Sequence, residues 1–316
     1  MQFRTQIPFK KQQHYKIDYN AKILTLGSCF TENIGNKLNY FKFSATVNPF
    51  GILFHPKAIE NLVLNAINEK KYAEENIFFQ NEQWHCFEAH SSLSNPSKEI
   101  LLQRLNASVD VTNKQIHEST HIIITLGTAW CYRFIETNTI VANCHKIPQK
   151  KFLKELLPVN EISESLSSTI ALIRNINKNA SVLFTVSPVR HLKNGVVENQ
   201  QSKSHLITAV HQVVEPRNNT FYVPSYEIMM DELRDYRFYA EDMIHPNNMA
   251  IQYIWEKFVQ VWFTSDAEDT MQEIETIQKG LLHRPFNPES EQHQEFLKNI
   301  DIKIKNLQSK FPKITF

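Results

Sequence analysis

The 316-residue sequence lacks the features that mark several large classes of protein. It has no apolar run of the roughly 18 residues that a membrane span needs, and its polar, basic N-terminus has no apolar centre like that of a secretion signal. Lysine and arginine total 34 against 33 aspartates and glutamates, so no global field attracts nucleic acid or an anionic membrane. We therefore expect a cytoplasmic protein that binds neither membranes nor nucleic acid.

Cysteine and glycine are also scarce. The 4 cysteines are too few and too scattered for a disulfide framework, and none forms a C-x-x-C pair, so we expect reduced thiols. Of the 6 glycines, Gly27, Gly51 and Gly127 lie at or just after apolar segments, where glycine suits a tight turn or a close backbone approach. The remaining composition, 42% hydrophobic and 21% charged, is that of an ordinary globular protein.

Short β-branched apolar runs, each stopped by Gly, Ser or Pro, predict buried strands. They lie at 22–28, 121–128, 181–188 and 220–225. Apolar residues at three- and four-residue steps predict helices over 161–178 and 202–214. Because strands and helices alternate, we expect an α/β fold with three layers, α/β/α, around a mainly parallel sheet.

Two regions depart from this alternation. Between 66 and 120 the pattern is harder to interpret, and we expect a helix near 56–70 followed by an irregular or β-hairpin insertion around 77–91. The C-terminal part predicts a core-facing helix over 247–263 and then a helical extension over 265–316, in which P-F-N-P at 285–288 separates two helices. We therefore expect a main domain over 1–264, and the sequence leaves open what the extension docks on.

The letters H-E-S-T-H at 117–121 match the H-E-x-x-H pattern of zinc proteases. That motif binds zinc when both histidines share one helical face. Here His121 opens a β-branched run that predicts a strand, so His117 and His121 should lie on different elements. We therefore predict no metal site.

A serine follows the first predicted strand at a position that suits a nucleophile. The strand Ile23–Leu26 ends in Gly27, and an amphipathic helix is predicted to start near Thr31. Reactive sites of open α/β sheets lie beyond the carboxyl ends of the strands, and the helix N-terminus there would stabilise a developing oxyanion beside Ser28. The same position also suits a helix cap, so a base is needed to decide between the two roles.

The candidate base lies in A-E-D-M-I-H-P-N at 240–247. Asp242 and His245 are three residues apart on a predicted turn, so the carboxylate can fix the imidazole tautomer while His245 contacts the serine. The alternative is an ordinary loop aspartate and a surface histidine at the start of the next helix.

Together these segments resemble the block pattern of the SGNH or GDSL-like esterase superfamily. More narrowly, L-G-S-C-F at 26–30 resembles the signature of the GSCFA family, with Thr31 where the family name has alanine. The resemblance covers most of residues 20–265 and implies a flavodoxin-like, SGNH-type sheet. Its further segments are N-P-F-G at 48–51, L-G-T-A-W at 126–130, N-C-H-K at 143–146, S-P-V-R-H at 187–191 and D-M-I-H-P-N at 242–247.

The resemblance implies that Ser28 is the nucleophile, that His245 is the general base and then acid, and that Asp242 orients the imidazole. It also implies an oxyanion hole made of the serine N–H, a glycine N–H and an asparagine amide, for which Gly51 and Asn48 are candidates. The segment G-T-A-W at 127–130 departs from the superfamily pattern, which has G-x-N-D at this place, because it contains no asparagine. Thr128 or Asn48 would have to replace that donor.

Other residues are weaker candidates. Arg190 and His191 follow a predicted strand at the sheet end where they would bind a polar or anionic substrate group, or they are plain loop residues. Cys29 is a second possible nucleophile near the helix start, although a small buried cysteine is the usual case. Lys203 and Trp130 are lesser substrate-binding candidates, and a tryptophan more often forms a pocket wall or core.

The expected activity is therefore cofactor-free hydrolysis of an acetyl-like group from a small or carbohydrate ester. The choice of ester rests on superfamily analogy. Two alternatives stay open: acyl transfer, and a catalytically weak or inactive module that binds or scaffolds. The substrate is expected to be a small molecule, and the sequence leaves the oligomeric state undefined.

Overall fold

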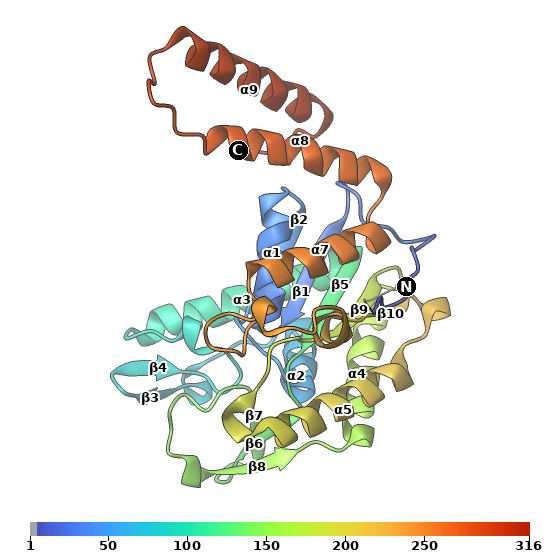
Figure 1. The fold of residues 1–316 in the computed structure, drawn as a ribbon. Helices are drawn as coiled ribbons and strands as arrows, with labels where there is room; N and C mark the ends of the chain where they lie inside the picture. The colour runs from blue at the N-terminus through green and yellow to red at the C-terminus, as the bar shows by residue number, and fades with distance from the viewer. Residues whose placement is uncertain (1–4) are drawn as a thin grey trace.

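The computed structural model describes residues 5–316, and within them a central sheet of five parallel strands forms the middle layer (Figure 1). In spatial order its strands are β2 (Ser44–Val47), β1 (Lys22–Gly27), β5 (His121–Leu126), β9 (Ser181–Val186) and β10 (Thr220–Val223). The order is that of a flavodoxin-like doubly wound sheet, in which the first strands are added toward one edge and the later strands toward the other, with the change between β1 and β5. The predicted fold class is confirmed.

Helices cover both faces of this sheet (Figure 1). One face is covered by α2 (Pro56–Ile67), α3 (Lys98–Glu118), α4 (Val159–Ile176) and α5 (Val196–Val213). The other is covered by α1 (Cys29–Tyr40), the π-helical turn Ile228–Glu232 and α7 (Asn248–Trp262). Alternate side chains of β1 enter the two cores, so Leu24 packs with the first set and Ile23 with the second.

The region between β2 and β9 contains additional strands at one side of the main sheet. The expected hairpin is present as β3 (Phe78–Gln80) and β4 (Gln83–His85), and the long helix α3 follows it. A second antiparallel sheet, in the order β7 (Thr139–Val141), β6 (Trp130–Phe134) and β8 (Phe152–Leu156), was not predicted. Its strands are short and partly exposed, so they lack the continuous apolar run of the central strands.

The C-terminal extension is a hairpin of α8 (Ser265–Leu281) and α9 (Glu291–Lys310), which projects from one end of the domain (Figure 1). Pro285–Pro288 lies between the two helices, as expected. Gly280 lets them approach closely, since a β-carbon there would lie 2.5 Å from Ile300. None of the helices in residues 5–316 is both long enough and apolar enough to cross a membrane.

Candidate active site

Ser28 lies at the carboxyl end of β1, where the chain turns into α1. Gly27 has a φ of 140°, and a β-carbon there would lie 2.2 Å from the Thr125 carbonyl oxygen of β5, so only glycine fits. The Ser28 N–H donates to that same carbonyl over 3.1 Å, and the Ser28 Oγ accepts a hydrogen bond of 3.3 Å from the Phe30 N–H. Ser28 is therefore the N-cap of α1, and its side chain is buried, with 1% of the residue exposed.

Asp242 and His245 form the predicted pair. The His245 Nδ1 donates to the Asp242 Oδ2 over 2.6 Å, and the Asp242 Oδ1 accepts from the Ile244 and His245 N–H groups over 2.9 and 3.0 Å. The hydrogen bonds from the His245 backbone and side chain, and then that from Ile244, lower the pKa of Asp242 to about 2. With Nδ1 donating to the carboxylate, the neutral imidazole presents Nε2 as an acceptor.

The loop that carries this pair is tied to the end of β9. The Arg190 N–H donates to the Ile244 carbonyl over 3.2 Å, and the Ala240 N–H donates to the His245 carbonyl over 2.8 Å. About half of the His245 side chain is exposed to solvent. Within the described chain, no hydrogen bond joins the Ser28 hydroxyl to His245, so the structure unites two of the three predicted catalytic side chains.

Asn48 follows β2 and supports the turn before Ser28. Its Oδ1 accepts from the Gly27 N–H over 2.9 Å, and its backbone has a φ of 42°, a left-handed conformation that asparagine tolerates. The Asn48 Nδ2 is buried and makes no hydrogen bond to the described residues. The Gly51 N–H, in contrast, donates to the Asn48 carbonyl over 2.7 Å. Of the two candidates, Asn48 is the one that presents an unused donor.

The Thr128 hydroxyl already has partners on α5 and within its own turn. It forms a hydrogen bond of 2.9 Å with the Ser202 hydroxyl and accepts from the Trp130 N–H over 3.1 Å. Thr128 thus fixes the turn from β5 into β6.

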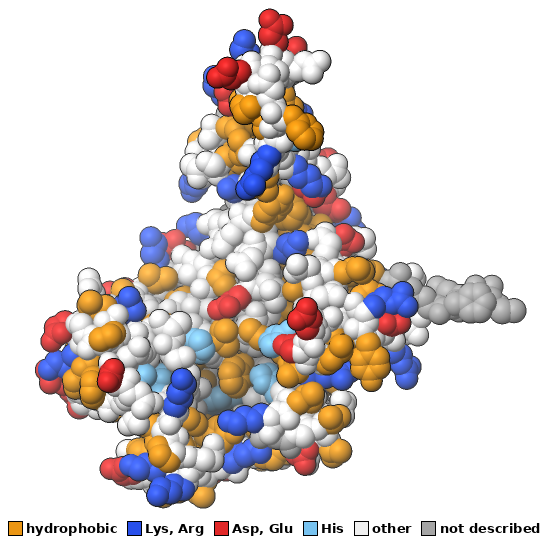
Figure 2. Space-filling view, turned by 60° about the vertical axis from the view of Figure 1, so that its left-hand side comes forward, with side chains coloured by type: hydrophobic (Ala, Val, Ile, Leu, Met, Phe, Trp, Pro, Cys, Tyr) orange, Lys and Arg blue, Asp and Glu red, His pale blue; other side chains and the backbone are white. Residues whose placement is uncertain are grey.

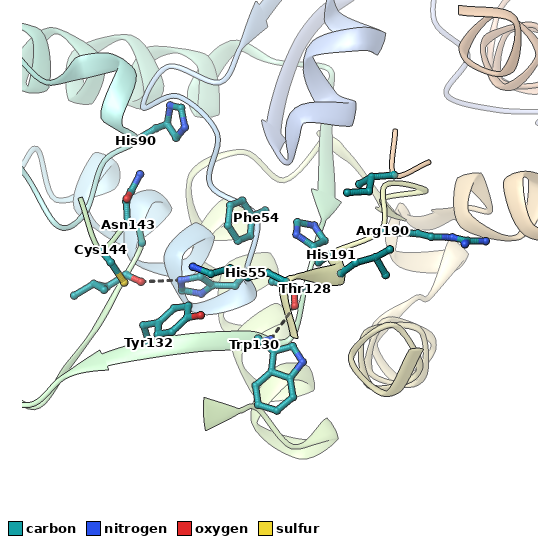
Figure 3. A pocket seen from close by; sticks show the side chains of 15 residues that line it. Phe54, His55, His90, Thr128, Trp130, Tyr132, Asn143, Cys144, Arg190 and His191 are labelled. Carbon is teal, nitrogen blue, oxygen red and sulfur yellow. Dashed lines mark hydrogen bonds between the residues drawn. The ribbon is translucent and has the colours of Figure 1, made fainter. Parts of the chain in front are cut away.

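A cavity of about 450 Å³ opens beside these strand ends, on a face where histidine side chains gather in a central hollow (Figure 2). Its wall includes Phe54, His90, Trp130 and His191. Figure 3 shows His191 next to Phe54, with 5.4 Å between the ring centroids. The predicted cavity role of His191 is therefore geometrically possible, and His90 is a cavity residue that the sequence did not suggest.

Arg190 also borders the cavity, but its guanidinium extends away from the other labelled side chains (Figure 3). The guanidinium carbon lies over the Tyr239 ring, 4.7 Å from its centroid, and Nη2 contacts the Met230 sulfur. In this arrangement Arg190 supports the loop next to His245, and its charge does not enter the cavity.

Lys203 of α5 is buried behind the cavity wall. Its Nζ donates to the carbonyl oxygens of Gly127 and Ser187, over 2.7 Å each, which ties the carboxyl ends of β5 and β9 together. Burial lowers the pKa of Lys203 to about 7. The sequence signal was a lysine three residues before Leu206 on the apolar face of a predicted helix.

Cys29, the alternative nucleophile, occupies the first position of α1. Burial and then the negative charge of Glu32 raise the pKa of its thiol, which disfavours the reactive thiolate. All four cysteines are free thiols. The serine is therefore the better nucleophile candidate at this turn.

The two histidines of H-E-S-T-H lie on different elements, as predicted. His117 is in the last turn of α3, with Nδ1 2.9 Å from the Asn113 carbonyl, and His121 begins β5, with Nε2 2.8 Å from the Tyr15 carbonyl. Across residues 5–316, no group of three His, Cys, Asp or Glu side chains is arranged to hold a metal ion.

Comparison with known families gives two matches. The model of the GSCFA family matches residues 22–258, which include Ser28, Asn48 and the Asp242–His245 pair. A second model, described as the C-terminal domain of GSCFA domain proteins, matches residues 274–316 and therefore most of the α8–α9 hairpin. None of the curated proteins matches the sequence.

Proposed function

Since the chain belongs to the GSCFA family, with a serine, an aspartate–histidine pair and an unused amide near the strand ends, we propose that it is an SGNH-type serine hydrolase. Its substrate would be a small or carbohydrate ester that carries an acetyl-like acyl group. The observation that carries the proposal is the Asp242–His245 hydrogen bond of 2.6 Å, which leaves Nε2 of the neutral imidazole to accept a proton. A small acyl group also suits a serine that is 1% exposed.

In the first half-reaction the Ser28 Oγ attacks the ester carbonyl, while His245 Nε2 takes the hydroxyl proton and then gives it to the departing alcohol. In the second, His245 takes a proton from water, which attacks the acyl-serine, and the carboxylic acid leaves as the proton returns to Ser28. Asp242 keeps Nδ1 protonated throughout. The Asn48 Nδ2–H and the first N–H groups of α1 would stabilise the negative acyl oxygen in both tetrahedral intermediates. The reaction needs no cofactor, and a competing alcohol in place of water would give acyl transfer.

One observation favours a second candidate, a binding or scaffolding module without efficient catalysis. The Ser28 Oγ accepts the capping hydrogen bond from Phe30, is buried, and makes no hydrogen bond to His245 in the described chain. This is the geometry of a helix cap.

Two measurements on the purified protein separate these candidates. We expect a fluorophosphonate to label the protein at Ser28, identified by peptide mass spectrometry, and we expect hydrolysis of p-nitrophenyl acetate to fall to the buffer rate in Ser28→Ala. Ser44→Ala, which changes an exposed serine at the start of β2, should behave like the wild type. Full activity in Ser28→Ala would reject this nucleophile, and a wild-type protein that is neither labelled nor active would favour the binding module.

A further inference from the structure

His191 carries a buried polar atom that the proposed mechanism does not use. Its Nε2 is buried and makes no hydrogen bond to the described residues, although the ring borders the cavity beside the strand ends. A buried polar atom without a partner costs free energy, and the position of this ring at the cavity allows a ligand group to complete the bonding.

We propose that His191 donates an Nε2–H hydrogen bond to the acyl oxygen of the substrate, from the side of Ser28 opposite to Asn48. This inference rests on the proposed serine hydrolase and adds a catalytic residue to it. It also identifies a donor on the β5 side of the site, where the Thr128 hydroxyl is already engaged with Ser202.

The order of the strands supports this placement. The sheet runs β2, β1, β5, β9, so the turn of Ser28 lies between the end of β2 and the end of β5. On one side, Asn48 is bonded to the Gly27 N–H through Oδ1 and has Nδ2 free. On the other side, the His191 Nε2 lies 3.1 Å from the point where a β-carbon of Gly127 would be. Neighbouring strands are about 4.8 Å apart, which lets donors on both sides approach one oxygen.

The absence of a side chain at Gly127 makes room for the imidazole. A β-carbon there would also lie 2.8 Å from the Phe54 β-carbon, so the glycine permits Phe54 and His191 to close over the end of β5. The His191 N–H donates to the Asn199 Oδ1 over 2.8 Å, which fixes the backbone that carries the ring. Because Lys203 ties the ends of β5 and β9, the donor is positioned before substrate binds, as electrostatic stabilisation requires.

The surroundings also suit a neutral donor. Burial, followed by the electrostatic effects of Lys203 and His245, lowers the pKa of His191 to about 3. At neutral pH the ring is therefore uncharged and does not compete with His245 as a base, but it still has one N–H to donate.

Two substitutions distinguish a hydrogen-bond donor role of His191 from a purely structural role of its ring. His191→Leu removes the N–H while filling the space, and His191→Gln can place an amide N–H near the position of Nε2. We expect kcat for p-nitrophenyl acetate to fall by about 100- to 1000-fold in His191→Leu, with little change in KM, and to stay within about tenfold of the wild type in His191→Gln. Labelling of Ser28 by a fluorophosphonate, whose P=O group occupies the same donors, should slow in parallel.

His117→Leu provides a matched control, since it makes the same change in the last turn of α3. Thermal unfolding should show that all three variants fold. If the wild type is active and labelled and His191→Leu is equally active, the role of His191 is overturned while the proposed hydrolase stands. Equal loss in folded His191→Leu and His191→Gln would also overturn the donor role, and a wild type that is neither active nor labelled would overturn both proposals.

Discussion

At the carboxyl end of the sheet, the turns that follow adjacent strands bury polar groups such as Asn48 and the Nε2 of His191, and Lys203 of α5 is buried beside them. The α8–α9 hairpin instead buries a row of apolar side chains, including Ile274, Ile277 and Leu307, and its helices begin with ordinary side-chain caps. The hairpin packs against the domain that contains these strand ends. The two regions differ in whether the buried groups are matched by partners within the chain.

The comparison distinguishes a region whose buried groups stabilise the fold from one that keeps buried polar groups at a cost in the free energy of folding. In the hairpin each local preference agrees with the fold, because the apolar spacing, the caps and the turn between the helices all favour the same structure. At the strand ends, Asn48 adopts a left-handed conformation, and two buried nitrogen atoms, Asn48 Nδ2 and His191 Nε2, have no partner within residues 5–316. Such local conflicts are typical of sites at which a ligand completes the bonding.

The largest expected effect is a loss of stability in acid, which originates at the cavity side of the molecule. Burial lowers the pKa of His55 and His145 to about 4 and that of His191 to about 3. Since these histidines have pKa values near 6.5 when unfolded, the unfolded chain binds more protons below that pH, and stability falls as the pH drops from about 6.5 to about 4. Each histidine adds a slope of about 1.4 kcal/mol per pH unit, or roughly 4 kcal/mol per unit for the three.

Urea unfolding at a series of pH values between 7.5 and 4.5 would measure this slope. His145→Gln keeps a side-chain donor for the Cys86 carbonyl, so it should preserve the fold while removing about a third of the pH dependence. A free energy of unfolding that stays level across this range would contradict the assignment of these histidines as buried and neutral.

The next effect concerns the pair that would supply the base. In Asp242→Asn the Oδ1 can still accept from the Ile244 and His245 N–H groups, but the amide no longer stabilises a proton on the His245 Nδ1. We expect hydrolysis of p-nitrophenyl acetate to fall by about 10,000-fold through the wrong imidazole tautomer. Asp235→Asn, a matched change at another aspartate that caps a short turn, should leave the rate within a few-fold. Comparable rates in the two variants would remove Asp242 from the mechanism.

Asn48→Asp tests the unused donor on the β2 side. The substitution keeps an oxygen for the Gly27 N–H and replaces the free N–H group with a carboxylate oxygen. We expect kcat to fall by at least about 100- to 1000-fold. Asn219→Asp makes the same change at another asparagine with a left-handed backbone, just before β10, and should leave kcat unchanged. Unchanged turnover in Asn48→Asp would mean that the strained turn serves the fold alone.

The sequence predicts four of the five central strands because each of these is an apolar run stopped by a turn residue, as in His121–Leu126. The edge strand β2 was not predicted, since its four residues are partly exposed and form no apolar run. Helix α1 and the α8–α9 hairpin could also be predicted, from their apolar periodicity and turn residues. The sheet β6–β7–β8 was not, because strands of three to five residues with mixed exposure give too short a pattern. The predicted helix start near Thr31 was two residues late, since Ser28 itself caps α1.

The candidate site was only partly accessible from the sequence. Asp242 and His245 are close in the chain, so local spacing was sufficient to predict their contact. The partnerless nitrogen of His191 and the two carbonyl bonds of Lys203 depend on strand ends that are brought together by the sheet, and no local pattern encodes them. The catalytic role of Ser28 remains a prediction that labelling can test.

The smallest expected effect lies in the hairpin. Ser290 is the N-cap of α9, where its Oγ accepts from the His293 N–H over 3.3 Å and donates to the Asn287 carbonyl over 2.9 Å. Ser290→Ala should lower the free energy of unfolding by about 1 kcal/mol. Ser309→Ala, in the last turn of α9, should change it by less than about 0.5 kcal/mol. Both variants should hydrolyse p-nitrophenyl acetate at the wild-type rate because, within residues 5–316, no hydrogen bond or ion pair joins the hairpin to the strand-end turns. A substantial loss of activity in Ser290→Ala would show instead that the hairpin and the candidate site are energetically coupled.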